Sequence, residues 1–162
     1  MEREAIFQLL LDQVRQDFDF LRIHGFTGPY VQTWPSQDVI WFTGKHLAIE
    51  FHLDWHDQAL DCYLVRLVEG KKPGGGYMDE EGKRIRLRLD SWLMSRVIQE
   101  PLSTLAKRAK RKKPTWGTQR LREEIEKLKQ YAVLLQERGH QILADNPQAF
   151  DQIEEELKER GE

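Results

Sequence analysis

The sequence has little of several features that would point to a class of function. Its 162 residues include one cysteine, Cys62, which excludes an internal disulfide and any metal site built from several cysteines. No apolar run approaches the roughly 20 residues that a membrane helix requires. The first turn mixes acidic and basic residues and lacks the pattern of a secretion signal. These absences predict a cytoplasmic protein with no membrane partner.

The chain as a whole also has no large excess of positive or negative charge. Lys and Arg number 25 and Asp and Glu 27, so the formal net charge is −2 and no global field favours nucleic acid or lipid. Hydrophobic residues make up 40% of the chain and charged residues 32%, a composition typical of a globular protein with its own core. With this length, we expect a single domain over residues 1–162.

Helical periodicity marks both ends of the chain. Residues 3–22 carry one apolar stripe, and a longer stripe with a four-three spacing begins at Thr118 and reaches Ile142. A short helix is expected after Asp90 or Ser91, and Asp145-Asn146-Pro147 introduces a last helix. The stripes comprise Ile6, Leu10, Val14, Phe18 and Leu21; Leu121, Ile125, Leu128, Ala132, Leu135 and Ile142; and Phe150, Ile153 and Leu157.

Between these helices the period changes to two, which indicates β-strands. In the clearest strand, Leu47–Trp55, apolar and polar residues alternate, as in an antiparallel strand covered on one side only. The fold class predicted is α+β: a four- or five-stranded antiparallel sheet covered on one face by an N-terminal helix and C-terminal helices. The expected strands are Tyr30–Trp34, Val39–Thr43, Leu47–Trp55, Ala59–Val68 and an edge strand Lys83–Leu89 with outward arginines.

Two segments depart from this regular pattern. Residues 70–82 contain Pro73, three consecutive glycines and an acidic cluster, and are predicted to form a flexible surface loop. They do not fit a phosphate-binding P-loop, because five residues rather than four separate Gly76 from Gly82-Lys83, and Arg84 stands where Ser or Thr is needed. Residues 107–113 form a basic segment with six cations in seven residues.

The polar face of the third strand is a candidate metal site. Glu50, His52, Asp54 and His56 alternate along one strand, and neighbours on one face lie about 6.5–7 Å apart. His52, Asp54 and His56 would be the ligands in a metal-dependent hydrolase. The alternative interpretation is the ordinary solvent face of a half-buried strand.

The basic segment is the candidate partner-binding site. It could neutralise phosphates while Trp116 stacks on a base, or it could bind an acidic protein. It could also pair with the chain's own acidic end, because residues 145–162 carry seven acidic and two basic side chains, a net charge of −5. The residues concerned are Lys107, Arg108, Lys110, Arg111, Lys112, Lys113 and Trp116.

Three further features have a structural and a functional interpretation. Cys62 is expected to be a small core residue, with a Cys–His nucleophile as the alternative. The stripe of the long helix fits either the chain's own core or a dimer seam, which leaves a monomer or a homodimer open. Trp34 or Trp41, on a short outer strand, could be a binding hot spot. No motif indicates a cofactor, so none is expected.

Three stretches resemble small bacterial α+β proteins that act as immunity partners in toxin systems. They are the end of the first helix at Phe20–Phe26, the strand pair at Leu47–Asp54 and Leu60–Leu67, and the segment Leu134–Leu143 with Ala144, Asp145 and Phe150. Together they cover about half of the chain and include no catalytic signature. The 70–82 loop and the basic segment depart from that pattern, so no binding residue is transferred.

The sequence therefore predicts a non-enzymatic protein-binding module, one that the resemblance associates with toxin neutralisation or bacterial defence. A nucleic-acid-binding protein that uses residues 107–113 is the first alternative. A metal-dependent hydrolase centred on His52, Asp54 and His56 is the second.

Overall fold

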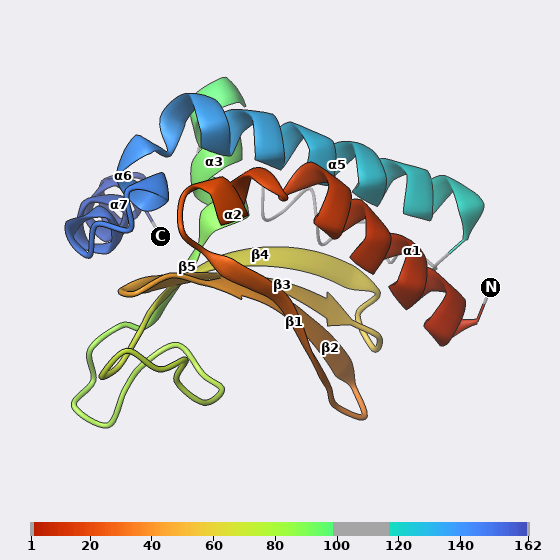
Figure 1. Cartoon of the computed structure of the whole chain (residues 1–162), viewed down its shortest axis with the longest axis horizontal. Helices are drawn as coiled ribbons and strands as arrows, with labels where there is room; N and C mark the ends of the chain where they lie inside the picture. The colour runs from red at the N-terminus through yellow and green to blue at the C-terminus, as the bar shows by residue number, and fades with distance from the viewer. Residues whose placement is uncertain (1, 99–116, 162) are drawn as a thin grey trace.

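The computed structural model describes residues 2–98 and 117–161. Five antiparallel strands form one sheet in the order β1-β2-β3-β4-β5, so each strand pairs with its neighbour in the chain. The predicted fold class is confirmed: the N-terminal helix and the C-terminal helices pack on one face of this sheet (Figure 1). The strands are β1 (Thr27–Thr33), β2 (Gln37–Thr43), β3 (Leu47–Asp54), β4 (Ala59–Arg66) and β5 (Arg86–Arg88).

The helices begin and end close to their predicted positions. The first predicted helix is divided into α1 (Arg3–Asp17) and α2 (Phe20–Ile23), and the longest into α5 (Thr118–Arg138) and α6 (His140–Leu143). The remaining described helices are α3 (Leu89–Ile98) and α7 (Gln148–Glu159). None of the helices in the described part of the chain is long and apolar enough to cross a membrane.

The core lies between the helices and the sheet face beneath them. Leu47, Ile49, Phe51 and Leu53 of β3 are fully buried there, opposite the apolar stripe of α1. The stripe of the long helix contributes Leu121, Leu128 and Leu135 to the same core, so the dimer-seam interpretation of this stripe is not needed. Burial of each such side chain contributes about 1.5–3 kcal/mol, which is the main force that holds the two layers together.

The second face of the sheet is not the open, solvated face that the alternation of β3 predicts. Ala48 and Glu50 on that face are fully buried, because residues 67–85 fold back against β3, β4 and β5. Figure 1 shows this loop on the side of the sheet away from the helices. The loop therefore divides the second face into a covered part and, towards β1, a part that stays accessible.

Candidate functional site

The edge strand β1 is the most exposed element of the sheet. Among residues 2–98 and 117–161 it pairs with β2 alone, and residues 30–36 are all exposed. The Trp34 N–H donates to the Gln37 carbonyl at 2.8 Å, and Tyr30 and Gln32 lie opposite Trp41 and Val39. Because amides alternate in direction along an antiparallel strand, those of Val31 and Thr33 point away from the sheet. This edge offers backbone donors and acceptors to solvent.

Large apolar side chains gather along the same edge. Ile23 is 85% exposed, Trp34 47%, Tyr30 45% and Val31 40%. We call these four residues the edge surface. Exposed edges are usually protected by charged residues, whereas β1 contains none. An apolar group of this kind along an exposed strand edge is typical of a contact with another protein.

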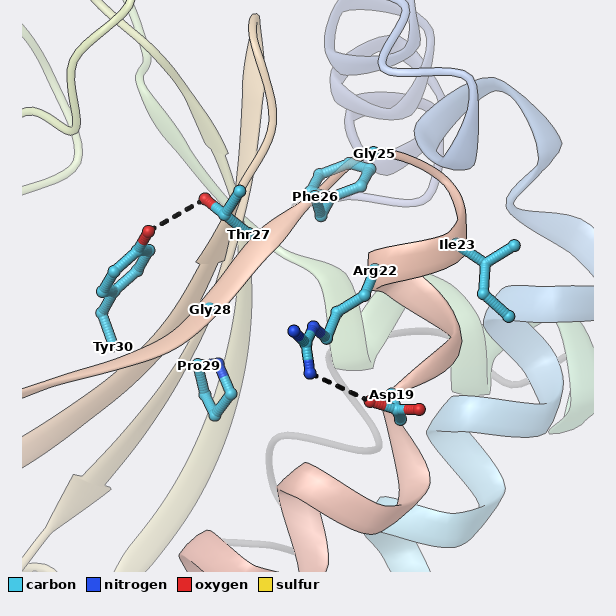
Figure 2. A pocket seen from close by; sticks show the side chains of 9 residues that line it. All are labelled: Asp19, Arg22, Ile23, Gly25, Phe26, Thr27, Gly28, Pro29 and Tyr30. Carbon is cyan, nitrogen blue, oxygen red and sulfur yellow. Dashed lines mark hydrogen bonds and ion pairs between the residues drawn. The ribbon is translucent and has the colours of Figure 1, made fainter.

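A pocket of about 740 Å³ opens beside this strand (Figure 2). Asp19, Arg22 and Ile23 line it from the helix side, and Pro29 and Tyr30 line it from β1. Arg22 and Asp19 form an exposed ion pair at 3.8 Å, which adds little stability and leaves both side chains able to contact a ligand. The pocket extends the edge surface and adds charged groups beside it.

Arg3 of α1 and Asp38 of β2 hold the β1–β2 hairpin, which presents the edge surface, in place. Arg3 donates to the carbonyl oxygens of Trp34 and Pro35, each at 2.7 Å, and pairs with Asp38 at 3.1 Å. Asp38 is buried and also accepts a hydrogen bond from the Trp55 ring at 2.8 Å. This charge-assisted network, anchored on the buried Asp38 carboxylate, fixes the turn, so the edge surface is ordered before any partner binds.

Gly28 gives β1 its close approach to β2. Its φ is +129°, and a Cβ at this position would lie 2.8 Å from the Trp41 carbonyl oxygen. Only glycine adopts this backbone conformation without strain. The beginning of the edge strand, next to the pocket, therefore has a shape that depends on one residue.

The covered part of the second face contains a buried charged group, which we call the Glu50 cluster: Glu50, His52, Lys72 and Arg86. The Glu50 carboxylate accepts hydrogen bonds from Arg86 Nε at 2.6 Å and Nη2 at 3.2 Å. His52 Nε2 and Lys72 Nζ each lie 3.1 Å from it. The buried Glu50 carboxylate is therefore compensated by three neighbours from the same chain.

Arg86 connects the loop to the sheet with all five of its N–H donors. Besides the two bonds to Glu50, it donates to the carbonyl oxygens of Gly74 at 2.6 Å, Gly76 at 2.8 Å and Pro73 at 3.2 Å. Arg86 is only 3% exposed. The prediction that the arginines of the fifth strand point outward is wrong for Arg86, because the loop covers it and supplies its partners.

The electrostatics of the Glu50 cluster favour the charged form of its carboxylate. Burial raises the pKa of Glu50, but the hydrogen bonds from His52 and Arg86 and the charges of both residues outweigh burial. The pKa of Glu50 is therefore held well below its ordinary value. A carboxylate that is ionised and fully paired stabilises the fold and is a poor acid or base for catalysis.

A second charged group lies beside this cluster. Arg88 pairs with Asp61 at 3.0 Å and with Asp90 at 2.9 Å, and thereby connects β4, β5 and the start of α3. Burial raises the pKa of the Asp61 carboxyl, with the Arg88 charge acting in the opposite direction. These pairs join the end of the sheet to the helices.

The three residues predicted to bind a metal do not converge. His52 contacts Glu50, and Asp54 Oδ1 accepts the backbone N–H groups of His56 at 2.9 Å and Asp57 at 2.8 Å in the turn after β3. Within residues 2–98 and 117–161, no group of three or more His, Cys, Asp or Glu side chains is arranged to hold a metal ion. The alternation along the strand predicted that these residues share one face. In the structure, Asp54 instead accepts hydrogen bonds from the turn backbone, and His52 contacts Glu50.

The predicted partner-binding residues of the basic segment, Lys107 to Lys113 with Trp116, lie outside the described residues. The acidic end of the chain contacts other arginines in the part that is described. Asp151 pairs with Arg66, and Glu154 lies 3.9 Å from Arg84. These two ion pairs attach α7 to β4 and to the loop that leads into β5.

Cys62 is confirmed as a core residue, since it is 1% exposed in the middle of β4. Burial raises the pKa of its thiol, so the nucleophilic thiolate is disfavoured. Of the two tryptophans suggested as hot spots, Trp34 is exposed on the edge surface, while Trp41 is half-buried between Tyr30 at 5.6 Å and Lys72 at 4.6 Å. Whether Trp34 is a hot spot stays a prediction. The pocket was not predicted from the sequence, because Asp19–Ile23 and Pro29–Tyr30 meet only in the folded chain.

Comparisons with known proteins give no relative from which a function can be transferred. The chain matches no protein-family model, and no curated protein or solved structure shows a significant match to it.

Proposed function

We propose that the protein is a non-enzymatic protein-binding module that uses the edge surface and the adjoining pocket to contact another protein. The observation that carries this proposal is the exposed strand β1 with its hairpin turn, which combines outward backbone amides with exposed Tyr30, Val31 and Trp34, together with exposed Ile23 in the neighbouring α2. The partner we expect presents an extended segment to β1 and an apolar side chain to the pocket.

The class of module is taken from the sequence resemblance to bacterial immunity proteins. Such a role requires a preformed surface more than a reactive centre, and two features agree with it. The hairpin is fixed by Arg3 and Asp38, so little ordering is needed on binding. The titratable groups of the Glu50 cluster are paired with one another beneath the loop.

The proposal can be tested by capture from the native cell extract with matched variants. Wild-type protein should retain a partner in stoichiometric amount, and Trp34→Ser combined with Ile23→Ser should release it. Truncation of a hot-spot residue typically costs about 2 kcal/mol or more, roughly a thirtyfold loss of affinity.

The matched control is Val133→Ser, which removes a 53% exposed apolar side chain from α5 rather than from the edge surface. We expect this variant to capture the same partner as wild type. Failure of wild-type protein to retain any stoichiometric partner would contradict the proposed function. Equal capture by the Trp34/Ile23 variant would show that the edge surface is not the binding site.

A further inference from the structure

The free edge of β1 has a restricted hydrogen-bonding pattern. The outward amides belong to Val31 and Thr33, and Pro29 and Pro35 lie two residues beyond them on either side. Proline has no N–H, so neither of these flanking positions can donate to an added strand. An added strand can therefore bond to two N–H donors and two carbonyl acceptors, those of Val31 and Thr33. Pro29 and Pro35, which flank them, offer no donor.

Only one antiparallel register of a second copy of β1 pairs both the N–H and the C=O of Val31 and of Thr33. With a two-fold axis at Gln32, Val31 lies opposite Thr33 of the second copy, and the two residues exchange both N–H···O bonds. Centring the axis on Val31 places Thr33 opposite Pro29 of the second copy, and centring it on Thr33 places Val31 opposite Pro35. In each of those registers a proline lies opposite Thr33 or Val31, whose carbonyl oxygen then lacks a donor, whereas in the Gln32 register only the proline carbonyls lack one.

The same register brings the exposed aromatic residues together. Tyr30, Gln32 and Trp34 lie on the sheet face away from the helices, and with the axis at Gln32 each Tyr30 lies opposite Trp34 of the other copy. These are non-hydrogen-bonded positions, where side chains approach most closely. Cross-strand aromatic pairs stabilise a sheet beyond the area they bury, and both rings are about half exposed in the single chain.

Charge also permits this pairing. Residues 27–37 of β1 and the following turn contain no charged side chain, so two copies meet along this edge without like charges opposite each other. We propose that, in the absence of another protein, a second copy of this chain occupies the β1 edge and extends the sheet across a two-fold axis at Gln32. Each dimer then contains four backbone hydrogen bonds and two Tyr–Trp pairs at the junction.

This inference goes beyond the proposed function and does not require it. The dimer covers the surface that the proposed partner needs, so the two associations exclude each other. The dimer is measured with purified protein alone, whereas the proposed function is measured by capture, so either can fail without the other.

The test is disulfide trapping at the two-fold axis. In Gln32→Cys, the two introduced thiols occupy a non-hydrogen-bonded pair with Cα atoms about 4.5 Å apart, a distance that a disulfide spans. In the control Tyr30→Cys, the two thiols are four residues out of register, roughly 13 Å apart. The native thiol of Cys62 is buried and does not interfere.

We expect mild oxidation to convert most of the Gln32→Cys protein to a covalent dimer and to leave Tyr30→Cys monomeric. Adding Val31→Pro to Gln32→Cys removes one outward N–H without touching the bonds to β2, and should abolish the crosslink. Wild-type protein should also show a rising mass by sedimentation as its concentration increases, and Val31→Pro should not. Equal crosslinking of the two cysteine variants, no crosslink in Gln32→Cys, or a constant monomer mass for the wild type would each overturn the inference.

Discussion

The two edge strands of the sheet, β5 and β1, differ in how far the rest of the chain covers them. β5 is three residues long, and the loop beside it closes its flank: the Ile85 N–H donates to the Tyr77 carbonyl at 2.8 Å, and Met78 and Arg84 form an antiparallel bridge. β1 is seven residues long, is mostly exposed, and in the described part of the chain pairs on one side only. The difference shows that this fold covers the edge that contains buried arginine and leaves the apolar edge accessible.

The chemistry of the two regions follows the same division. Near β5, charged side chains such as Arg86, Arg88, Glu50 and Asp61 are paired within the chain, where they hold the loop and the helices to the sheet. Along β1 there is no charge, and the exposed groups are aromatic rings, a branched aliphatic side chain and backbone amides. The first region stabilises the fold, and the second is available for binding.

The largest effect on the free energy of unfolding is expected from disrupting the Glu50 cluster near β5. Arg86→Met leaves the Glu50 carboxylate without its bidentate partner and removes the donor to three loop carbonyls. Removal of one partner from a buried ion pair typically costs about 3–5 kcal/mol. The free energy of unfolding from urea titration should fall by that amount.

The matched control replaces both partners. Glu50→Leu combined with Arg86→Met also removes the buried carboxylate, which Arg86→Met leaves with Lys72 and His52 as its remaining partners, so the double variant should be more stable than Arg86→Met alone. A single Arg86→Met variant as stable as wild type would show that the Glu50 cluster does not hold the loop.

A smaller effect should follow from acid. The pKa of Glu50 is lowered in the folded protein from an ordinary value of 4.5, so its contribution to stability is complete above that pH and is lost as pH falls through and below it. Loss of charged hydrogen bonds of this kind is worth about 1.5–3 kcal/mol. Urea unfolding at several pH values should show wild type losing stability faster than Glu50→Gln below about pH 4.5. Parallel pH profiles for the two proteins would argue against this assignment.

The smallest effect on stability is expected at the open edge. Val31→Lys changes an exposed side chain and should alter the free energy of unfolding by no more than about 0.5 kcal/mol. The same change puts a charge on the β1 edge and should abolish trapping in the Gln32→Cys background. A variant that is strongly destabilised, or one that still crosslinks, would remove the contrast between the two edges.

Much of the fold could be predicted from periodicity. The stripes that begin at Ile6 and Phe150 are buried as expected, and all five strands are present. The helix breaks at Phe18–Asp19 and at Gly139 were not predicted, because the apolar stripe continues across both. A hydrophobic pattern specifies which face is buried, but not where the backbone bends while keeping that face inward.

The sites were harder to predict because they depend on segments distant in sequence. The alternation of the third strand predicts that Glu50 faces solvent, and its burial depends on Lys72 from within the 70–82 loop and Arg86 from beyond it. The sequence likewise predicts that the Arg86 side chain points outward, whereas it is buried. The exposure of Trp34 was suggested by its place on a short outer strand, whereas the outward direction of the Val31 and Thr33 amides required the register with β2.

Amide hydrogen exchange measured residue by residue by NMR tests the contrast between the edges most directly. In dilute protein we expect the Val31 and Thr33 amides to exchange much faster than the Ile85 amide, which is bonded to Tyr77, and faster than the Gln32 amide between them. At high protein concentration the Val31 and Thr33 amides should slow as the second copy pairs with them. Protection of Val31 and Thr33 equal to that of Ile85 in dilute monomer would contradict the account, because it would mean that the β1 edge is already covered by the chain itself.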